Sequence, residues 1–359
     1  MTAVERWLAF TPRDTVTVRD GRSFQAGTDS SAETVRPWPS TIAGAVRTAY
    51  GKEPEAVRGP VLARRTGTGG WEPYLPMPAD VVRPPGSPRA CLLRPDPELA
   101  GIATDLGEGL LAPPATTGKV EEVQGWVPGA RFADYLHGTI RPAGFDLDET
   151  LRPYGAGRDP LVPERRVGLA RTGGRTAREG FLYQSTHLRP LDGWSFLACN
   201  DVPEDDDWTP QGPTPFGGRG RLADVAEVSG VDWPAAPTTF PDGRVLVYLA
   251  TPALWPEGWR PETPAGADLV GAAVPTPRPV ATASPREARR RGARLMSTVA
   301  LRWAVPAGAV YLLRFDDPAR AAAWAREQHA RPWGPPAAAR LDTAGFGIAL
   351  IGTWKGPGS

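Results

Sequence analysis

Proline and glycine interrupt this 359-residue chain along its whole length, with 42 prolines and 41 glycines. Together they make up close to a quarter of the residues, and they are spread throughout instead of being gathered into one tail. The chain is also 41% hydrophobic and 23% charged, as is typical of globular proteins. We therefore expect a folded core that carries many long loops, and not a disordered chain.

The termini and cysteines indicate where such a chain would reside. The N-terminus lacks the pattern of a basic stretch followed by an apolar stretch that marks a secretory signal. No apolar run approaches the ~18 residues that span a membrane. Cys91 and Cys199 lie far apart and form no disulfide framework. These observations predict a cytoplasmic protein with no membrane partner.

The chain opens with a strand, a long polar loop and a helix. The sequence WLAF at 7–10 and the alternating TVTV at 15–18 predict strand structure, and Asp20-Gly21 marks a turn. About seventeen polar residues follow, and compact domains rarely keep such a loop unless it is functional. Ser40 or Thr41 could cap a helix whose apolar residues recur at helical spacing until Gly51 ends it.

The remainder alternates between strands and short helices. Strands are predicted at 165–171, 181–188, 194–199, 243–254, 269–276, 305–315 and 345–354, and helices at 131–138, 284–294 and 317–329. Residues 52–162 are proline-rich and predict insertions. The pattern favours an α+β class with antiparallel sheets and long loop insertions. A ferredoxin-like arrangement of each half, 1–160 and 161–359, is our working interpretation.

No catalytic or metal-binding pattern emerges from the titratable residues. His137, His187 and His329 are not spaced as metal ligands, and no motif of a known nucleophile or nucleotide loop is found. The glycine-rich segments at 217–221 and 345–352 lack the βαβ context that a dinucleotide fold requires. We expect no catalytic residue, metal or cofactor.

Arginine clusters beside glycines and aromatic residues indicate a different chemistry. The net charge is only +1, so the chain lacks the strongly basic composition that is the usual sign of a nucleic-acid-binding domain. Glycine nevertheless permits close backbone approach, and flanking arginines can hold phosphates. Single-stranded RNA is a natural candidate, because it is bound by backbone contacts and by stacking on exposed aromatic rings. Phe24, Phe181, Tyr183 and Phe216 lie near arginines in the sequence, although burial in the core is the more common fate of such residues.

Six segments in order resemble one family. They are RDGRSFQAG with PWPSTIAGAVRTAYG, RRVGLARTGGRTAREGFLYQSTHLR, FGGRGRLADV, YLATPALWPEGWRP, VPAGAVYLLR and FGIALIGTW. The chain resembles subunit three of the Cmr complex, the type III-B CRISPR effector. The likeness spans almost the whole chain, and residues 52–162 match it poorly.

The resemblance implies a RAMP protein with two ferredoxin-like (RRM-like) domains. It implies a non-catalytic subunit that caps the 5′ tag of the CRISPR RNA and contacts the large polymerase/cyclase-like subunit and the backbone subunit. Target RNA would be reached through the complex. It also implies a protruding hairpin, or thumb, against the guide–target duplex, for which Ala112–Trp126 is our candidate.

We assign RNA contacts to the long loop, the helix after it and the arginine clusters of the second half. Ser40 and Thr41 would hold a phosphate at the helix N-terminus, with Arg47 farther along. The assigned residues are Arg19, Arg22, Phe24, Ser40, Thr41, Arg47, Arg171, Arg175, Gly217, Gly218, Arg219 and Arg221. Arg19 could instead pair with Asp20 or Glu33 and shape the loop.

An enzyme is the alternative. Some RAMP relatives cut precursor CRISPR RNA with a histidine as general acid or base, and His187, between two strand stretches, is the candidate here. A general base needs positioned partners, and the sequence reveals none for His187.

Overall fold

The structure is a computed structural model that describes residues 3–18, 34–99, 101–108, 111–113, 118–152, 159–282, 300–337 and 340–356. Helices and strands are mixed, and every strand pair in these ranges is antiparallel. The predicted α+β class with antiparallel sheets is confirmed. No helix in the described residues is long and apolar enough to cross a membrane.

One large sheet has seven strands. Its order is β11 (Trp126–Pro128), β3 (Trp71–Pro76), β2 (Ala56–Arg65), β15 (Trp194–Pro203), β1 (Ala3–Pro12), β17 (Leu222–Val228) and β16 (Thr214–Pro215). Along β1 the side chains alternate between faces, so Leu8 and Phe10 pack with Ile42 and Val46 of helix α1 (Pro39–Tyr50). Trp7 and Ala9 belong to a smaller apolar cluster on the opposite face.

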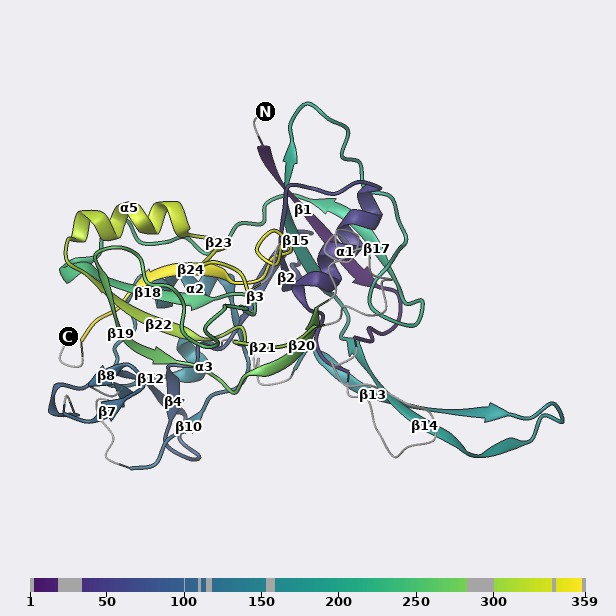
Figure 1. Ribbon diagram of the computed structural model, residues 1–359, viewed down its shortest axis with the longest axis horizontal. Coiled ribbons are helices and arrows are strands. Elements are labelled where there is room, and N and C mark those ends of the chain that lie inside the picture. The colour runs from purple at the N-terminus through teal and green to yellow at the C-terminus, as the bar shows by residue number, and fades with distance from the viewer. Residues whose placement is uncertain are drawn as a thin grey trace.

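A second sheet of five strands lies beside the first (Figure 1). Its order is β19 (Ala267–Ala273), β22 (Val310–Phe315), β18 (Arg244–Leu249), β24 (Ile348–Thr353) and β23 (Arg331–Pro332). Helices cover both faces. Helix α5 (Pro318–Gln328) packs on the face that carries Val245 and Val247, and α2 (Gly129–Leu136) packs on the face that carries Leu246 and Tyr248.

The proline-rich part of the chain forms small sheets near the second large one. A four-stranded sheet has the order β10 (Glu121–Glu122), β4 (Val81–Arg83), β5 (Arg89–Leu92) and β12 (Phe145–Asp146). The two-residue strands β6 (Arg94–Pro95) and β9 (Leu111–Ala112) form a pair, as do β7 (Ala103–Thr104) and β8 (Gly107–Glu108). Within the described residues, the remaining helices are α3 (Leu147–Thr150) and two 3₁₀ turns, Pro97–Leu99 and Pro241–Gly243.

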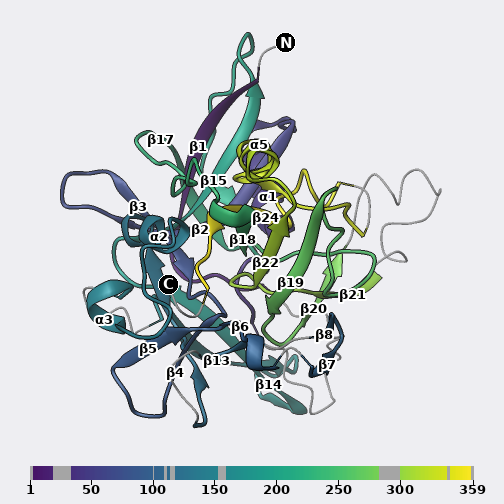
Figure 2. The ribbon, with the colours of Figure 1, turned by 90° about the vertical axis from the view of Figure 1, so that its left-hand side faces the viewer.

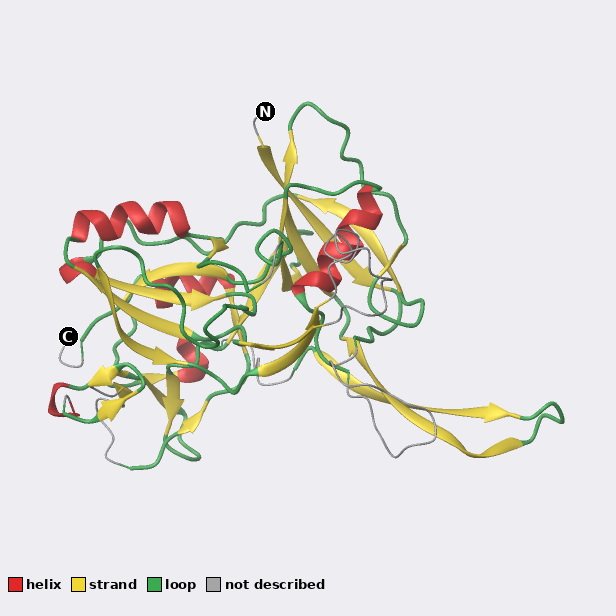
Figure 3. Cartoon of the chain, in the orientation of Figure 1, coloured by secondary structure: helices red, strands yellow, loops and turns green. Residues whose placement is uncertain are grey.

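Two further strand pairs stand outside these sheets. The longer one, β13 (Leu161–Arg171) with β14 (Ala177–Pro190), projects far from the body of the molecule (Figures 1 and 3). The shorter one, β20 (Arg278–Thr282) with β21 (Ala300–Ala304), lies between the two large sheets in Figure 1. Figure 2 gives the view from the side of the second sheet.

Both halves of the sequence contribute to both large units. Strands β15 and β17 come from beyond residue 160 and complete the seven-stranded sheet, whereas α2 comes from before it and packs on β24. A Cβ added at Gly352 of β24 would lie 2.6 Å from the carbonyl oxygen of Leu136 in α2, so the close contact requires glycine there. The division into domains at 1–160 and 161–359 stays a prediction.

Several predicted elements need correction. The stretch TVTV is no strand, because its contact with β14 is an isolated bridge between Val16 and Leu188. Helix α1 begins at Pro39 after the N-cap residue Trp38, with no side-chain cap, so Ser40 and Thr41 lie inside the helix. Its predicted end is confirmed, since Gly51 adopts φ 69° at the C-cap. The helix predicted at 284–294 lies outside the described residues.

Candidate nucleic-acid interface

The protruding hairpin lies elsewhere than predicted. The described residues of Ala112–Trp126 form no hairpin of their own: they are loop residues, the two-residue strand β10 and one terminal residue each of β9 and β11. The hairpin is instead β13–β14, whose ladder runs from the pair Leu161 and Pro190 to the pair Arg171 and Ala177 around a turn at 172–176. The two strand patterns were visible in the sequence, but their pairing depends on a register that neither pattern reveals alone.

Ion pairs hold the base of this hairpin. The carboxylate of Asp14, just after β1, accepts from Arg166 of β13 at 2.9 Å, Arg189 of β14 at 2.8 Å and Arg221 at 2.6 Å. Glu164 accepts from Arg166 at 2.6 Å and from Arg189 at 2.5 Å. The hydrogen bond from Arg166 is the largest of the effects that lower the pKa of Asp14. Three arginines thus surround two carboxylates.

The glycine-rich loop before β17 adds a fourth arginine. Gly217 has φ 84°, and a Cβ there would lie 2.7 Å from the carbonyl oxygen of Thr17, so this approach requires glycine. The amide N–H of Gly218 donates to that same oxygen at 2.6 Å. Arg219, at φ 59°, donates from Nη1 to Ser185 Oγ at 3.3 Å. The loop is therefore fixed against both the start of the chain and the hairpin.

His187 lies at the centre of this arrangement and is only 2% exposed. Its Nδ1 is 2.9 Å from Thr15 Oγ1 and 3.0 Å from Thr17 Oγ1, and its Nε2 is 3.3 Å from Ser185 Oγ. Burial lowers the pKa of His187, and the charges of Arg221, Arg166 and Arg219 lower it further. The imidazole is therefore held neutral within a group of hydroxyls.

The long loop leaves from and returns to this same place. Val18 is the last described residue before it, and its carbonyl oxygen accepts from Val35 N–H at 2.9 Å just after the loop. Thr34 Oγ1 donates to the carbonyl oxygen of Thr186 in β14. Arg19, Arg22 and Phe24 lie outside the described residues. The ends of their loop, however, meet the hairpin base and the loop that carries Arg219.

The other assigned residues are more dispersed. Arg171 and Arg175 are exposed at the far end of the hairpin, and Arg47 is exposed in the last turn of α1. Arg171 and Arg175 therefore do not line one cleft with Arg219 and Arg221. Phe216 is buried against Phe10, with 5.7 Å between ring centroids, and belongs to the core. The sequence analysis missed four residues of the hairpin base, because each has a partner more than a hundred residues away in the sequence or on a neighbouring strand. These residues are Asp14, Glu164, Arg166 and Arg189.

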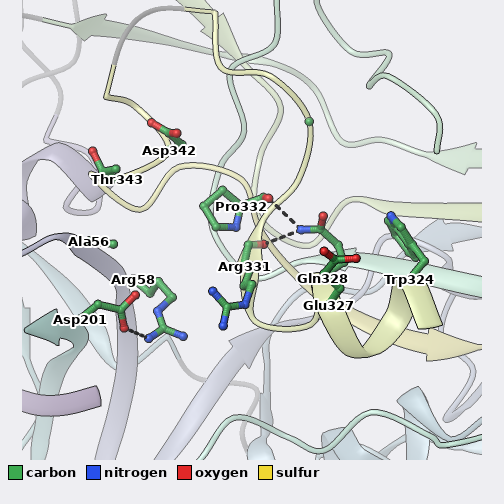
Figure 4. A pocket seen from close by; sticks show the side chains of 11 residues that line it. Ala56, Arg58, Asp201, Trp324, Glu327, Gln328, Arg331, Pro332, Asp342 and Thr343 are labelled. Carbon is green, nitrogen blue, oxygen red and sulfur yellow. Dashed lines mark hydrogen bonds and ion pairs between the residues drawn. The ribbon is translucent and has the colours of Figure 1, made fainter. Parts of the chain in front are cut away.

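A concave site lies between the two large sheets (Figure 4). It has a volume of about 550 Å³ and is lined by β2, β15, α5 and β23. Buried Arg58 pairs with Asp201 and with Glu5, and it donates to the carbonyl oxygen of Ala330 at 3.4 Å. Burial raises the pKa of Asp201 despite this arginine. Both arginines and carboxylates line this site, so it lacks the excess of arginine found at the hairpin base. We describe it as a structural contact between the two sheets.

Comparison with known proteins decides the family. The family model described as CRISPR-associated protein (Cas_Cmr3) matches residues 8–354. The chain belongs to the Cmr3 family. The match includes the strands, the projecting hairpin and the glycine-rich loop described above, and it confirms the resemblance seen in the sequence.

Two solved structures are similar to this Cmr3-family chain. One is a chain of the type III-B Cmr-beta complex bound to cognate target RNA and AMPPnP, with 12% identity and a TM-score of 0.49. Another is a chain of the same complex bound to cognate target RNA, with 12% identity and a TM-score of 0.48. In both, 85% of this chain and 86% of the other are covered. No curated protein matches the chain.

Proposed function

We propose that this Cmr3-family chain is a non-catalytic subunit of a type III-B Cmr effector complex that binds and caps the 5′ tag of the CRISPR RNA. The observation that carries the proposal is the base of the β13–β14 hairpin, where Arg166, Arg189 and Arg221 surround two carboxylates. Arg219 lies beside them and donates to Ser185. An excess of arginine suits an anion, and the planar guanidinium matches phosphate geometry.

The geometry supports a backbone contact with RNA more than a base-specific one. Arg219 and Arg221 are on a loop fixed by two backbone approaches to Thr17, so their guanidinium groups are positioned in advance. The ends of the loop that carries Arg19, Arg22 and Phe24 meet at the same place, and this supports a continuous RNA contact across them. Gly217 and Gly218 allow this approach, and Ser40, Thr41, Arg47, Arg171 and Arg175 remain candidate contacts outside the base.

The finer assignments follow from the family. We infer that the two large sheet units are the ferredoxin-like domains of a RAMP protein. The chain would bridge the large polymerase/cyclase-like subunit to the backbone subunit and reach target RNA through the complex, in the cytoplasm and in support of antiviral RNA targeting.

A precursor-processing ribonuclease is the less favoured alternative. His187 is 2% exposed, and its nearest polar partners are hydroxyl groups of Thr15, Thr17 and Ser185. A general base must reach the proton that it removes, and this burial argues against such a role. Purified chain incubated with labelled precursor RNA should leave the RNA intact. Metal-independent cleavage that His187→Ala abolishes would instead establish the enzyme.

Copurification tests the proposed assignment. An affinity-tagged chain expressed with the other complex subunits should bring down the large subunit and short RNAs that share a constant 5′ end. Sequencing of the bound RNA after limited nuclease digestion should show that 5′ end protected. Protection elsewhere on the RNA, or none, would contradict tag capping.

A further inference from the structure

Arg219 occupies a backbone conformation that few arginines adopt. Its φ is 59°, in the left-handed region where a residue with a Cβ is disfavoured. Gly217 and Gly220 also have positive φ, at 84° and 66°. Strained residues of this kind persist where surrounding contacts hold them, and they are concentrated at binding sites. An arginine at a position where glycine would fit more easily indicates a use for its side chain.

A closed ring of contacts holds Arg219 from two sides. Just before it, Gly218 N–H donates to the carbonyl oxygen of Thr17 at 2.6 Å. Its own Nη1 donates to Ser185 Oγ at 3.3 Å. His187 completes the ring, because its Nε2 lies 3.3 Å from Ser185 Oγ and its Nδ1 lies 3.0 Å from Thr17 Oγ1. The backbone before Arg219 and the side chain of Arg219 are thus tied to one small cluster.

The register of the hairpin places the serine and the histidine on one face. Ser185 is opposite Arg166 and His187 is opposite Glu164, so the four side chains share the face that carries the ion pairs. Ser185 is 8% exposed and His187 is 2% exposed, and packing therefore fixes both. Arg219 itself is exposed. Two buried side chains thus support one that a ligand can reach.

The support holds the guanidinium without cancelling its charge. A guanidinium only donates, so Ser185 Oγ is the acceptor in its contact with Arg219. The hydroxyl is neutral, in contrast to the Asp14 carboxylate that accepts from Arg221. The imidazole behind it is neutral as well, because burial and the nearby arginines lower the pKa of His187. A cation that is held in place by neutral groups suits an anionic ligand.

We propose that Ser185 and His187 are positioning residues that hold the Arg219 guanidinium for a phosphate of the bound RNA. Ser185 acts directly, and His187 acts by fixing Ser185. This inference rests on the proposed RNA-binding function and deepens it, since it names the side chains that set the geometry of one phosphate contact. The sequence analysis gave neither residue a role in holding RNA.

Variants of the full chain within the assembled complex test the proposal. Ser185→Ala removes the acceptor and keeps the charge of Arg219. We expect the affinity for a fluorescent single-stranded RNA to fall about fivefold, because the guanidinium must then be ordered when RNA binds. The salt dependence of binding should stay close to that of the wild type, since no cation is removed. Ser185→Thr keeps a hydroxyl on a residue that suits a strand, and it should retain the affinity.

A double-mutant cycle distinguishes positioning from a general loss of structure. If Ser185 acts through Arg219, Ser185→Ala should lower the RNA affinity no further in the Arg219→Ala background. A serine that only stabilises the fold would lower the affinity by the same factor in both backgrounds, and this result would overturn the proposal. His187→Leu removes both ring nitrogens and should follow the same pattern, with a loss of about twofold. A loss of the same size in both backgrounds would overturn the role of His187.

Ser195 of β15 provides the matched control. It is 1% exposed, and its Oγ lies 2.7 Å from Thr11 Oγ1. Ser195→Ala therefore also removes a buried hydroxyl contact, but at a site away from the hairpin base, and it should bind RNA as the wild type does. Equal losses of affinity in Ser185→Ala and Ser195→Ala would overturn the proposal.

Arg219→Ala separates this inference from the proposed function. If Arg219→Ala weakens RNA binding and flattens its salt dependence while Ser185→Ala leaves the affinity unchanged, the RNA-binding function stands and the positioning role is refuted. If neither Arg219→Ala nor Arg221→Ala changes RNA binding, the proposed RNA-binding function itself fails.

Discussion

Two arginine–carboxylate clusters in this molecule have similar chemistry and opposite settings. In the first, Arg94 donates to Asp80 at 2.7 Å, and Tyr135 donates to the other oxygen of Asp80 at 2.7 Å. All three residues are buried, and Asp80 is fully so. In the second, Asp14 at the hairpin base accepts from Arg166, Arg189 and Arg221, and its side chain is 38% exposed.

The difference separates a structural role from the binding role that we propose. The buried cluster matches one arginine to one carboxylate, and it ties the small sheet of the proline-rich region to α2. Its charges are accessible to no ligand. The hairpin base has more arginines than carboxylates and remains in contact with solvent, so its arginines can exchange partners with an incoming phosphate. The arginine content alone would not have distinguished the two clusters.

The largest expected effect comes from breaking the buried pair. Asp80→Ala leaves Arg94 buried without a counter-charge and removes the acceptor of Tyr135. We expect the free energy of unfolding to fall by about 3–5 kcal/mol, the usual cost of removing one partner of a buried pair. Urea denaturation of the purified chain measures this. A decrease below about 1 kcal/mol would mean that the cluster is not structural.

A smaller effect is expected from the hairpin base. Arg221→Ala should lower the RNA affinity of the complex on the order of tenfold, or ~1.4 kcal/mol, because one charge-assisted hydrogen bond to the RNA is removed. Fluorescence anisotropy with labelled RNA measures it. The matched variant Arg131→Ala, an exposed arginine on α2, should bind as the wild type does. Equal decreases in both variants would show that only overall charge matters.

His187 makes the stability of the hairpin base depend on pH. Its pKa is lowered in the folded chain, so the folded state favours neutral imidazole. The stabilisation is therefore complete above the ordinary pKa of about 6.5, and it is lost as the pH falls from there through the folded pKa.

The test compares His187→Gln with the wild type in urea denaturation on either side of pH ~6.5. Glutamine takes up no proton, so the variant should lose less stability on acidification. Part of the dependence should remain, because burial also lowers the pKa of His329. Identical pH profiles of stability for the two proteins would show that His187 does not contribute to the pH dependence.

The smallest effect is expected for Asp14→Asn. Because this carboxylate is partly exposed, its ion pairs should contribute no more than about 1 kcal/mol to stability. The variant should bind RNA somewhat more tightly, since a negative charge beside three arginines is removed while the side-chain shape is kept. Thermal unfolding and RNA titration at low salt measure the two quantities. A large loss of stability in Asp14→Asn would show that the Asp14 cluster has a structural role like that of the buried Asp80 cluster.

Local signals were sufficient for the elements with strong periodicity. The sequence predicted β18, β22 and β24, and it predicted α5 as a helix over 317–329. Asp317 caps this helix by accepting from Ala319 N–H. The stretch TVTV failed because its backbone makes one isolated bridge, at Val16, while the carbonyl oxygens of Thr17 and Val18 accept from Gly218 and Val35, which lie outside any strand.

Features set by long-range pairing escaped prediction. The projecting hairpin requires the register of β13 against β14, and the Asp14 cluster requires β1 to lie near both. The sequence singled out Gly217, Gly218, Arg219 and Arg221 because glycine next to arginine is a local pattern.

The salt dependence of RNA binding tests the central claim most directly. The double variant Arg219→Ala/Arg221→Ala should reduce the slope of log affinity against log salt concentration by about two, one for each phosphate that is no longer neutralised. The control Arg131→Ala/Arg141→Ala removes two exposed arginines from outside the hairpin base and should keep the wild-type slope. A wild-type slope in the first variant would contradict an RNA interface at the hairpin base.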